Sequence, residues 1–160
     1  AEDKLDLYEK EIYDSNFSLL SKSLSKDLIE DTRMNLLTCD EYETIGDYQN
    51  RIANRLHMLY ENSIEIDAER AKMLFKLHSL AVELFSDISR AARTGEKELY
   101  SSGLKKYQAL KTYYKEAKRE HFARSEDIAG RLNTGYLDII NYYKRISDHT
   151  YNIIEYVLKI

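Results

Sequence analysis

The sequence predicts an all-α fold, an elongated antiparallel bundle of about five long helices. The chain has no proline and only 5 glycines among 160 residues, so it is poor in the residues that end helices and shape turns. Apolar residues recur at steps of three and four over long stretches, which places them on one face of a helix. No segment alternates with period two for long enough to predict a strand. The length fits one domain with one core.

The first two predicted helices lie in the N-terminal half of the chain. The first is marked by an apolar stripe of Leu5, Tyr8, Ile12 and Leu19. The second runs from about Ser25 to about Asn62 and, at 1.5 Å per residue, is over ~50 Å long. Its stripe consists of Ile45, Tyr48, Ile52, Leu56 and Leu59. We expect each stripe to be buried against a neighbouring helix.

The third predicted helix runs from about Asp67 to Thr94, and Gly95 ends it because glycine readily adopts the left-handed conformation that follows a helix. Its stripe consists of Leu74, Leu77, Ala81, Leu84, Ile88 and Ala91.

The last two predicted helices lie in the C-terminal half. A fourth, basic helix carries the stripe Leu104, Tyr107, Leu110, Tyr114 and Ala117. The fifth begins near Ser125, with Glu126 and Asp127 in the first turn, where the helix dipole favours acidic side chains. Its stripe consists of Ile139, Tyr143, Ile146, Thr150, Ile153, Val157 and Ile160.

Charge is distributed unequally along the chain. Residues 1–70 carry 8 basic and 17 acidic side chains, whereas residues 71–160 carry 16 and 11. Much of the positive charge lies between Gly103 and Arg124, where Lys111, Lys115 and Lys118 are interleaved with tyrosines. Such a segment suits phosphate backbones or anionic lipid headgroups, but a basic helix also complements the acidic N-terminal half. We favour the second interpretation and keep these three lysines as a candidate partner or membrane surface.

Several function classes lack their motifs in this sequence. It has no glycine-rich nucleotide-binding loop, no Gly-x-Ser-x-Gly element and no histidine with an acid three residues earlier, so no nucleotide enzyme, serine hydrolase or ferritin-like di-metal oxidase is predicted. The lone Cys39 is predicted to be a small buried side chain in a reducing compartment. No stretch approaches the roughly 18 apolar residues of a membrane-spanning helix. Because a helical pattern is already running by Leu5, we expect the chain to be a piece of a longer protein.

An internal duplication links the second and fifth predicted helices. Residues 45–48 read IGDY and residues 146–149 read ISDH, an offset of 101 positions that also aligns Ile52 with Ile153 and Leu59 with Ile160. Chance agreement of apolar spacing is the alternative, but it leaves the aligned aspartates as a coincidence. We predict a single domain over residues 1–160 with two tandem helical repeats, about 1–95 and about 96–160, packed against each other.

These segments resemble the signature of PhoU domains. Residues 145–155 read RISDHTYNIIE, which is similar to the family pattern Glu-Arg-Ile-Gly/Ser-Asp-His-x-x-Asn-Ile-Ala-Glu, and residues 43–48, ETIGDY, resemble its first copy. The form of the second copy is similar to the PhoU-like region of bacterial sodium-dependent phosphate cotransporters. The resemblance implies two pseudo-symmetric three-helix units, a role in controlling phosphate uptake and, in some members, metal clusters bound by a Glu/Asp-x-x-x-Asp motif in each repeat.

The metal motif is only partly present. Glu43 and Asp47 lie one turn apart and could present two carboxylates to a hard cation such as a divalent metal or iron. In the second copy Lys144 replaces the first acid. The predicted ligands are Glu43, Asp47, Asp148, Asn152 and Glu155. The alternative is two ordinary ion pairs, Asp47 with Arg51 and Lys144 with Asp148.

The function expected from this resemblance is non-enzymatic. We expect a regulatory domain of phosphate transport, the cytoplasmic part of a sodium/phosphate cotransporter, on the cytoplasmic side of the bacterial inner membrane. Its expected partner is the membrane part of the same transporter or a transport and sensor complex, with a homodimer as an open alternative and no nucleic acid. The runner-up functions are a free-standing PhoU regulator of a phosphate uptake ATPase and its sensor kinase, and a metal-storing or metal-dependent bundle enzyme.

Overall fold

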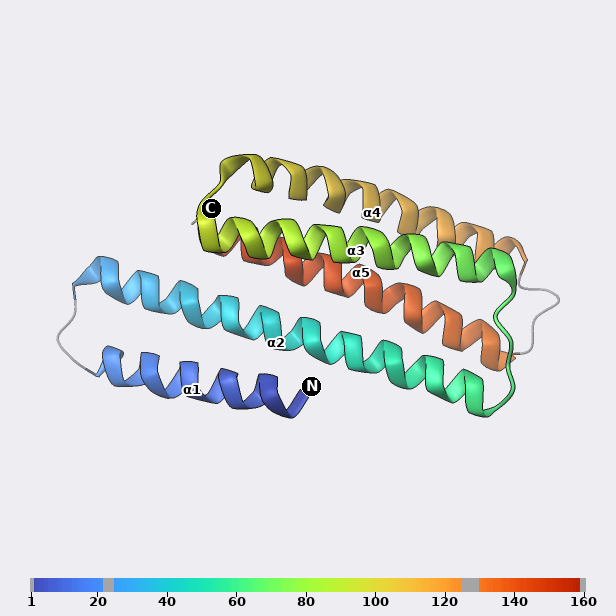
Figure 1. The fold of residues 1–160 in the computed structure, drawn as a ribbon, viewed down its shortest axis with the longest axis horizontal. Helices are drawn as coiled ribbons and strands as arrows, with labels where there is room; N and C mark the ends of the chain where they lie inside the picture. Colours follow the sequence, from blue (N-terminus) through green and yellow to red (C-terminus); the bar gives the residue numbers. More distant parts are fainter. Residues whose placement is uncertain (1, 22–24, 125–129, 159–160) are drawn as a thin grey trace.

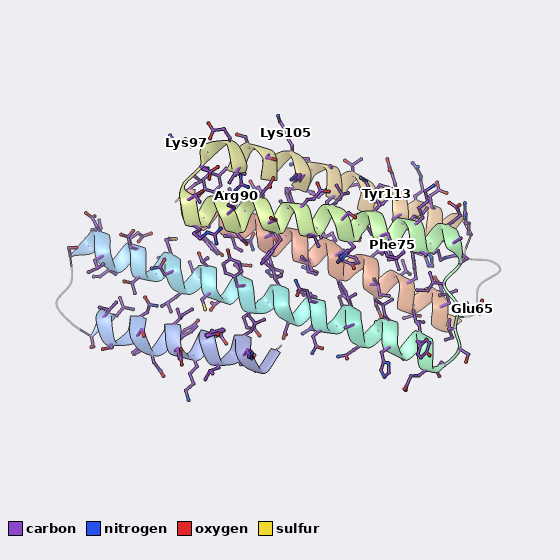
Figure 2. All side chains as sticks on the ribbon, viewed as in Figure 1. Glu65, Phe75, Arg90, Lys97, Lys105 and Tyr113 are labelled. Atoms are coloured by element: carbon purple, nitrogen blue, oxygen red, sulfur yellow. The ribbon has the colours of Figure 1, made fainter. Side chains whose placement is uncertain are left out.

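The computed structural model describes residues 2–21, 25–124 and 130–158, and every regular element in these ranges is a helix. The predicted fold class is confirmed: the helices lie roughly side by side along the long axis of an elongated molecule, and their side chains fill the spaces between them (Figures 1 and 2). The helices are α1 (Glu2–Leu20), α2 (Lys26–Glu61), α3 (Ala68–Thr94), α4 (Lys97–Ala123) and α5 (Gly130–Leu158).

Local sequence signals fix the ends of α2 and α3 as predicted. The Ser25 hydroxyl accepts a hydrogen bond from the backbone N–H of Leu28, and the Asp67 carboxylate accepts one from the N–H of Arg70 at 3.0 Å. Both are N-caps, which satisfy amides that the first helical turn leaves unpaired. Gly95 follows α3 with φ of 71°, the left-handed conformation that ends a helix at low cost for glycine.

The pair formed by α2 and α5 is the centre of the bundle. Helix α3 packs on both α4 and α5, α4 also packs on α5, and α1 packs along α2 at the opposite edge (Figure 1). Helices α3 and α5 supply more than half of the buried apolar side chains among the described residues, and Leu77, Leu84, Ile88, Ile139 and Ile153 of their predicted stripes are fully buried. Cys39 is buried, as expected.

Three stripe predictions were wrong because a stripe does not reveal whether a neighbour covers it. In α1, Leu5, Tyr8, Ile12 and Leu19 all remain exposed, since the helix packs on α2 and makes no comparably extensive contact with α3, α4 or α5 within the described residues. Leu56 of α2 and Leu104 of α4 are also exposed. The predicted start of the last helix at 125–127 and the stripe position 160 lie outside the described residues.

The packing groups the helices differently from the predicted repeat boundary. A boundary near residue 95 would place α3 with α1 and α2, but α3 packs on α4 and α5. In packing terms α2, α3, α4 and α5 form one continuous bundle, and α1 lies along α2 at its edge. The division into two repeats stays a prediction.

Candidate functional site

The two signature segments meet across the seam between α2 and α5. Tyr48 of the first segment and His149 of the second occupy equivalent positions in the 101-residue alignment, and their rings stack with centroids 5.6 Å apart. Tyr48 also contacts the ring of Tyr142. Tyr48 and His149, which are equivalent in the alignment of the two segments, are therefore in direct contact. The predicted site residues are best located relative to this seam.

The two acids of the first segment lie on α2. Asp47 pairs with Arg51 one turn later, at 3.4 Å, as the ion-pair alternative predicted. Burial, and then the negative charge of Asp47, raise the pKa of Glu43 above its usual value. The carboxylates of Glu43 and Asp47 repel each other, and the nearby cation, Arg51, forms its ion pair with Asp47.

The second segment places its predicted residues in separate contacts. Asp148 pairs with Lys144, again as the ion-pair alternative predicted, and accepts a hydrogen bond from the Tyr107 hydroxyl of α4 at 3.3 Å. Burial and the Asp148 carboxylate raise the pKa of that hydroxyl to about 12, so Tyr107 stays a donor at neutral pH. Asn152 points instead to α2, and Glu155 is half-buried. Asp148 thus holds α4 on α5.

Glu41 is the polar centre of the seam, and sequence reasoning missed it. Its carboxylate is buried, with 8% of the residue exposed. It contacts three side chains of α5: His149 at 2.6 Å, Asn152 at 3.0 Å and Tyr156 at 3.2 Å. A buried carboxylate is tolerated when donors satisfy its oxygens, so this arrangement, the Glu41 clamp, fixes the register of α2 against α5.

A signal for Glu41 was present in the sequence. It precedes Ile45 by four residues and therefore extends the apolar stripe of α2 toward its N-terminus. His149, Asn152 and Tyr156 repeat at steps of three and four on α5. An acid in line with an apolar stripe indicates a buried carboxylate that needs donors from the facing helix.

The predicted metal ligands do not form one cluster in this structure. Within residues 2–21, 25–124 and 130–158, no group of three or more His, Cys, Asp or Glu side chains is arranged to hold a metal ion. Asp47 and Asp148 each have a cationic partner, and Asn152 is used by the Glu41 clamp. The metal site stays a prediction, and the contacts present on both helices are those of the ion-pair alternative.

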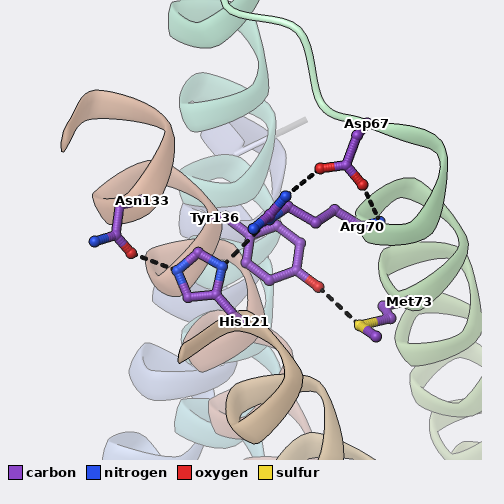
Figure 3. Close-up of polar contacts among 6 residues, drawn as sticks. All are labelled: Asp67, Arg70, Met73, His121, Asn133 and Tyr136. Atoms are coloured by element: carbon purple, nitrogen blue, oxygen red, sulfur yellow. Dashed lines mark hydrogen bonds and ion pairs between the residues drawn. The ribbon is translucent and has the colours of Figure 1, made fainter. Parts of the chain in front are cut away.

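A second buried polar cluster joins the start of α3, the end of α4 and the start of α5 (Figure 3). Arg70 pairs with Asp67 and donates from Nε to Nδ1 of His121 at 3.4 Å. Because Nδ1 accepts this bond, the ring proton lies on Nε2, which donates to the side-chain oxygen of Asn133. Nη2 of Arg70 is buried and has no hydrogen-bond partner among the described residues.

His121 is neutral in this cluster. The residue is 1% exposed, and burial lowers the pKa of its ring below the ordinary value, against the effect of the Asn133 hydrogen bond. Its ring stacks on Tyr136, whose own pKa burial raises to about 12. The Tyr136 hydroxyl contacts the sulfur of Met73 on α3 (Figure 3). The cluster therefore ties three helices together at one end of the bundle.

An apolar groove runs between α2 and α3 above α5. It consists of two adjoining hollows of about 430 and 310 Å³ that share Leu56, His78 and Tyr143. The Tyr143 hydroxyl and His78 Nδ1 form a hydrogen bond of 3.2 Å at the junction. Along the rim, Phe75 is 72% exposed and Val82 is 52% exposed. The groove thus leaves large apolar side chains of α2 and α3 open to solvent.

The three candidate lysines lie on α4, at the outer edge of the bundle (Figure 1). Lys111 lies over the ring of Tyr107 and Lys118 over the ring of Tyr114, with the ammonium groups 5.0 and 5.8 Å from the ring centroids. Lys115 between them is exposed. The structure therefore brings the lysines to one surface.

The fold and the seam define an all-α bundle built on a central pair of helices that a buried carboxylate clamps together. The sequence model of the PhoU domain family matches residues 74–157, which include the whole second signature segment. The chain therefore belongs to the PhoU domain family, which is a regulatory, non-enzymatic family. The first signature segment lies outside the matched residues, so the duplication that relates it to the second segment stays a prediction.

A solved structure shares this fold over nearly the whole chain. The phosphate transport system regulatory protein PhoU from Streptococcus pneumoniae is 21% identical and superposes with a TM-score of 0.82, over 98% of this chain and 73% of that chain. A comparison with curated proteins gave no match. Among the described helices, none combines the length and the apolar character needed to cross a membrane.

Proposed function

We propose that this protein is a free-standing regulator of phosphate transport that acts by binding the components of a phosphate uptake system. The observation that carries the proposal is the PhoU domain match over residues 74–157 together with the shared fold of a phosphate transport system regulatory protein. That relative supports a free-standing regulator better than the cytoplasmic part of a sodium/phosphate cotransporter, which was our first expectation.

The surface of the bundle supports a binding role. Exposed apolar surface grouped along a groove is typical of protein contact sites, and the groove between α2 and α3 carries Leu56, Phe75 and Val82. The expected partners are the ATP-binding subunit of a phosphate uptake transporter and the sensor kinase that responds to phosphate.

A direct binding measurement tests the proposal. The protein is immobilised, and the purified ATP-binding subunit and the cytoplasmic part of the sensor kinase from the same organism are passed over it. We expect at least one of them to bind, and the ATP-binding subunit of an unrelated transporter not to bind. If neither binds, and deleting the gene leaves phosphate uptake and a phosphate-starvation reporter unchanged, the proposal is wrong.

Two matched variants show whether the groove makes the contact. Phe75 on the groove and Phe17 on α1 are both 72% exposed, so replacing either with serine removes the same side chain from a similar environment. We expect Phe75→Ser to weaken binding about tenfold or more, as for an apolar anchor worth over 1 kcal/mol, and Phe17→Ser to leave it unchanged. Equal effects would exclude the groove as the contact.

A further inference from the structure

One strip along α4 combines lysines with exposed apolar side chains. Its members are Lys97, Leu104, Lys111, Lys115, Lys118 and Phe122. Their spacing of seven, seven, four, three and four residues keeps them on one side of the helix. The strip spans about 37 Å from Lys97 to Phe122. It runs along the edge of the bundle, where Lys97 points away from the neighbouring helices (Figure 2).

All the charged side chains of the strip are positive. None of its four lysines forms an ion pair within the part of the chain that the structure describes, whereas Lys106, on the side facing α3, pairs with Asp87 at 2.7 Å. The three acids of α4, Glu98, Glu116 and Glu120, lie about 100° or more around the helix axis from the nearest strip residue, given 3.6 residues per turn. No carboxylate of α4 itself therefore interrupts the strip.

Two large apolar side chains lie within this positive strip. Leu104 is 44% exposed and Phe122 is 51% exposed. Lysines interspersed with leucine and phenylalanine on one helical face are the pattern of helices that lie in a membrane interface, where the apolar groups enter the headgroup region and the ammonium groups meet anionic lipids.

The tyrosines of α4 argue against a nucleic acid as the occupant. Tyr107 is buried and stacks on Tyr151 of α5 with ring centroids 4.5 Å apart, and the Tyr114 hydroxyl bonds to Asn141. These rings are engaged inside the protein, so they are not available to stack on bases as single-strand binding requires. An acidic protein would use the lysines but has no need of Leu104 and Phe122, which lie on either side of Lys111, Lys115 and Lys118.

We propose that the α4 strip binds the surface of an anionic lipid bilayer and holds the bundle with α4 parallel to the membrane. The lysines supply the electrostatic attraction, and Leu104 and Phe122 insert into the headgroup region on either side of Lys111, Lys115 and Lys118. The inference is independent of the partner proteins proposed above, since it concerns lipid alone. A regulator held in this way would search for a membrane transporter in two dimensions.

Sedimentation with lipid vesicles tests the strip. The probes are vesicles of phosphatidylcholine alone and of phosphatidylcholine mixed with phosphatidylglycerol. We expect binding to the mixed vesicles that weakens at high salt, because salt screens surface charge, and little binding to phosphatidylcholine alone. Each lysine near an anionic surface contributes a factor of about five in affinity, so the triple variant Lys111→Gln, Lys115→Gln, Lys118→Gln should bind roughly a hundredfold more weakly.

A matched variant controls for net charge. Lys10, Lys72 and Lys76 are exposed lysines of α1 and α3, and replacing all three with glutamine removes the same charge while leaving the strip intact. This control should bind mixed vesicles like the unmodified protein, and the double variant Leu104→Ser, Phe122→Ser should bind more weakly at every salt concentration. All the substituted side chains reach solvent, and circular dichroism verifies that each variant is folded.

Several results would overturn the proposal. Equal binding to both kinds of vesicle would show that charge does not direct the contact. Loss of binding in the control triple variant, or unchanged binding in the strip variant, would place the contact elsewhere. If vesicles do not bind but an acidic protein or an RNA binds through the three lysines, the occupant is not a membrane.

Discussion

Replacing Glu41 with alanine should lower the free energy of unfolding by about 3 kcal/mol. The substitution removes three contacts to a buried carboxylate, those with His149, Asn152 and Tyr156. A hydrogen bond to a charged group contributes about 1.5–3 kcal/mol. The three partners are only partly buried and can regain water after the truncation, so we assign each contact about 1 kcal/mol. For a chain of this size the loss corresponds to a fall of roughly 6–12 °C in the melting temperature.

Urea unfolding followed by circular dichroism measures this loss. Glu43→Ala is the matched control, because Glu43 lies two residues further along α2. Burial and the charge of Asp47 raise the pKa of Glu43, so its surroundings disfavour the charged carboxylate instead of stabilising it. We expect its effect on the free energy of unfolding to stay within about 0.5 kcal/mol. Glu41→Gln keeps one acceptor oxygen and should cost about half as much as alanine. A loss below about 1 kcal/mol for Glu41→Ala, or an equal loss for Glu43→Ala, would refute the clamp.

Three further predictions follow from the structure. Burial lowers the pKa of His121 below its ordinary value of 6.5, so the unfolded chain takes up a proton at a higher pH than the folded protein does. The neutral His121 ring therefore stabilises the fold fully above pH 6.5, and this stabilisation is lost as the pH falls below 6.5. Unfolding of His121→Gln across pH 5–8 should show a weaker pH dependence than that of the unmodified protein. Gly103→Ala should destabilise by about 1 kcal/mol in thermal unfolding, because a Cβ there would lie 2.2 Å from Cδ1 of the fully buried Ile88 and overpacking outweighs the gain in helix propensity. Gly130→Ala should not destabilise, because a Cβ there would meet no atom of the described residues within 4 Å. Elemental analysis of protein purified without chelators decides between the predicted metal site and the two ion pairs: the ion pairs predict no stoichiometric iron, zinc or manganese and no thermal shift on adding them, whereas a bound metal would support the metal site.

Local signals allowed the helices to be predicted well. Ser25, Asp67 and Gly95 act within three residues of the helix ends they fix, so their effect can be read without knowing the fold. The two ion pairs, Asp47 with Arg51 and Lys144 with Asp148, also join residues one turn apart. Such contacts depend on helical spacing alone.

Contacts between distant residues could not be predicted in the same way. Glu41 and His149 are 108 residues apart, and Arg70 and His121 are 51 apart, so neither pair has a spacing that indicates contact. The signature alignment did bring Tyr48 and His149 to the same seam, because it compared two segments rather than one. The stripe of α1 was read correctly as helical and wrongly as buried, since periodicity gives a face but not the element that covers it.

Because α1 lies at the edge of the bundle, we expect it to separate from α2 without unfolding of the whole domain. A helix that packs along a single neighbour has fewer tertiary contacts to lose than one in the centre, so its separation costs less than unfolding of the whole domain. Its backbone amides should then exchange with solvent deuterium through a local opening, while those of α5 should exchange only through global unfolding. The bundle would therefore behave as two cooperative units of unequal stability, with the more labile one at its N-terminal edge.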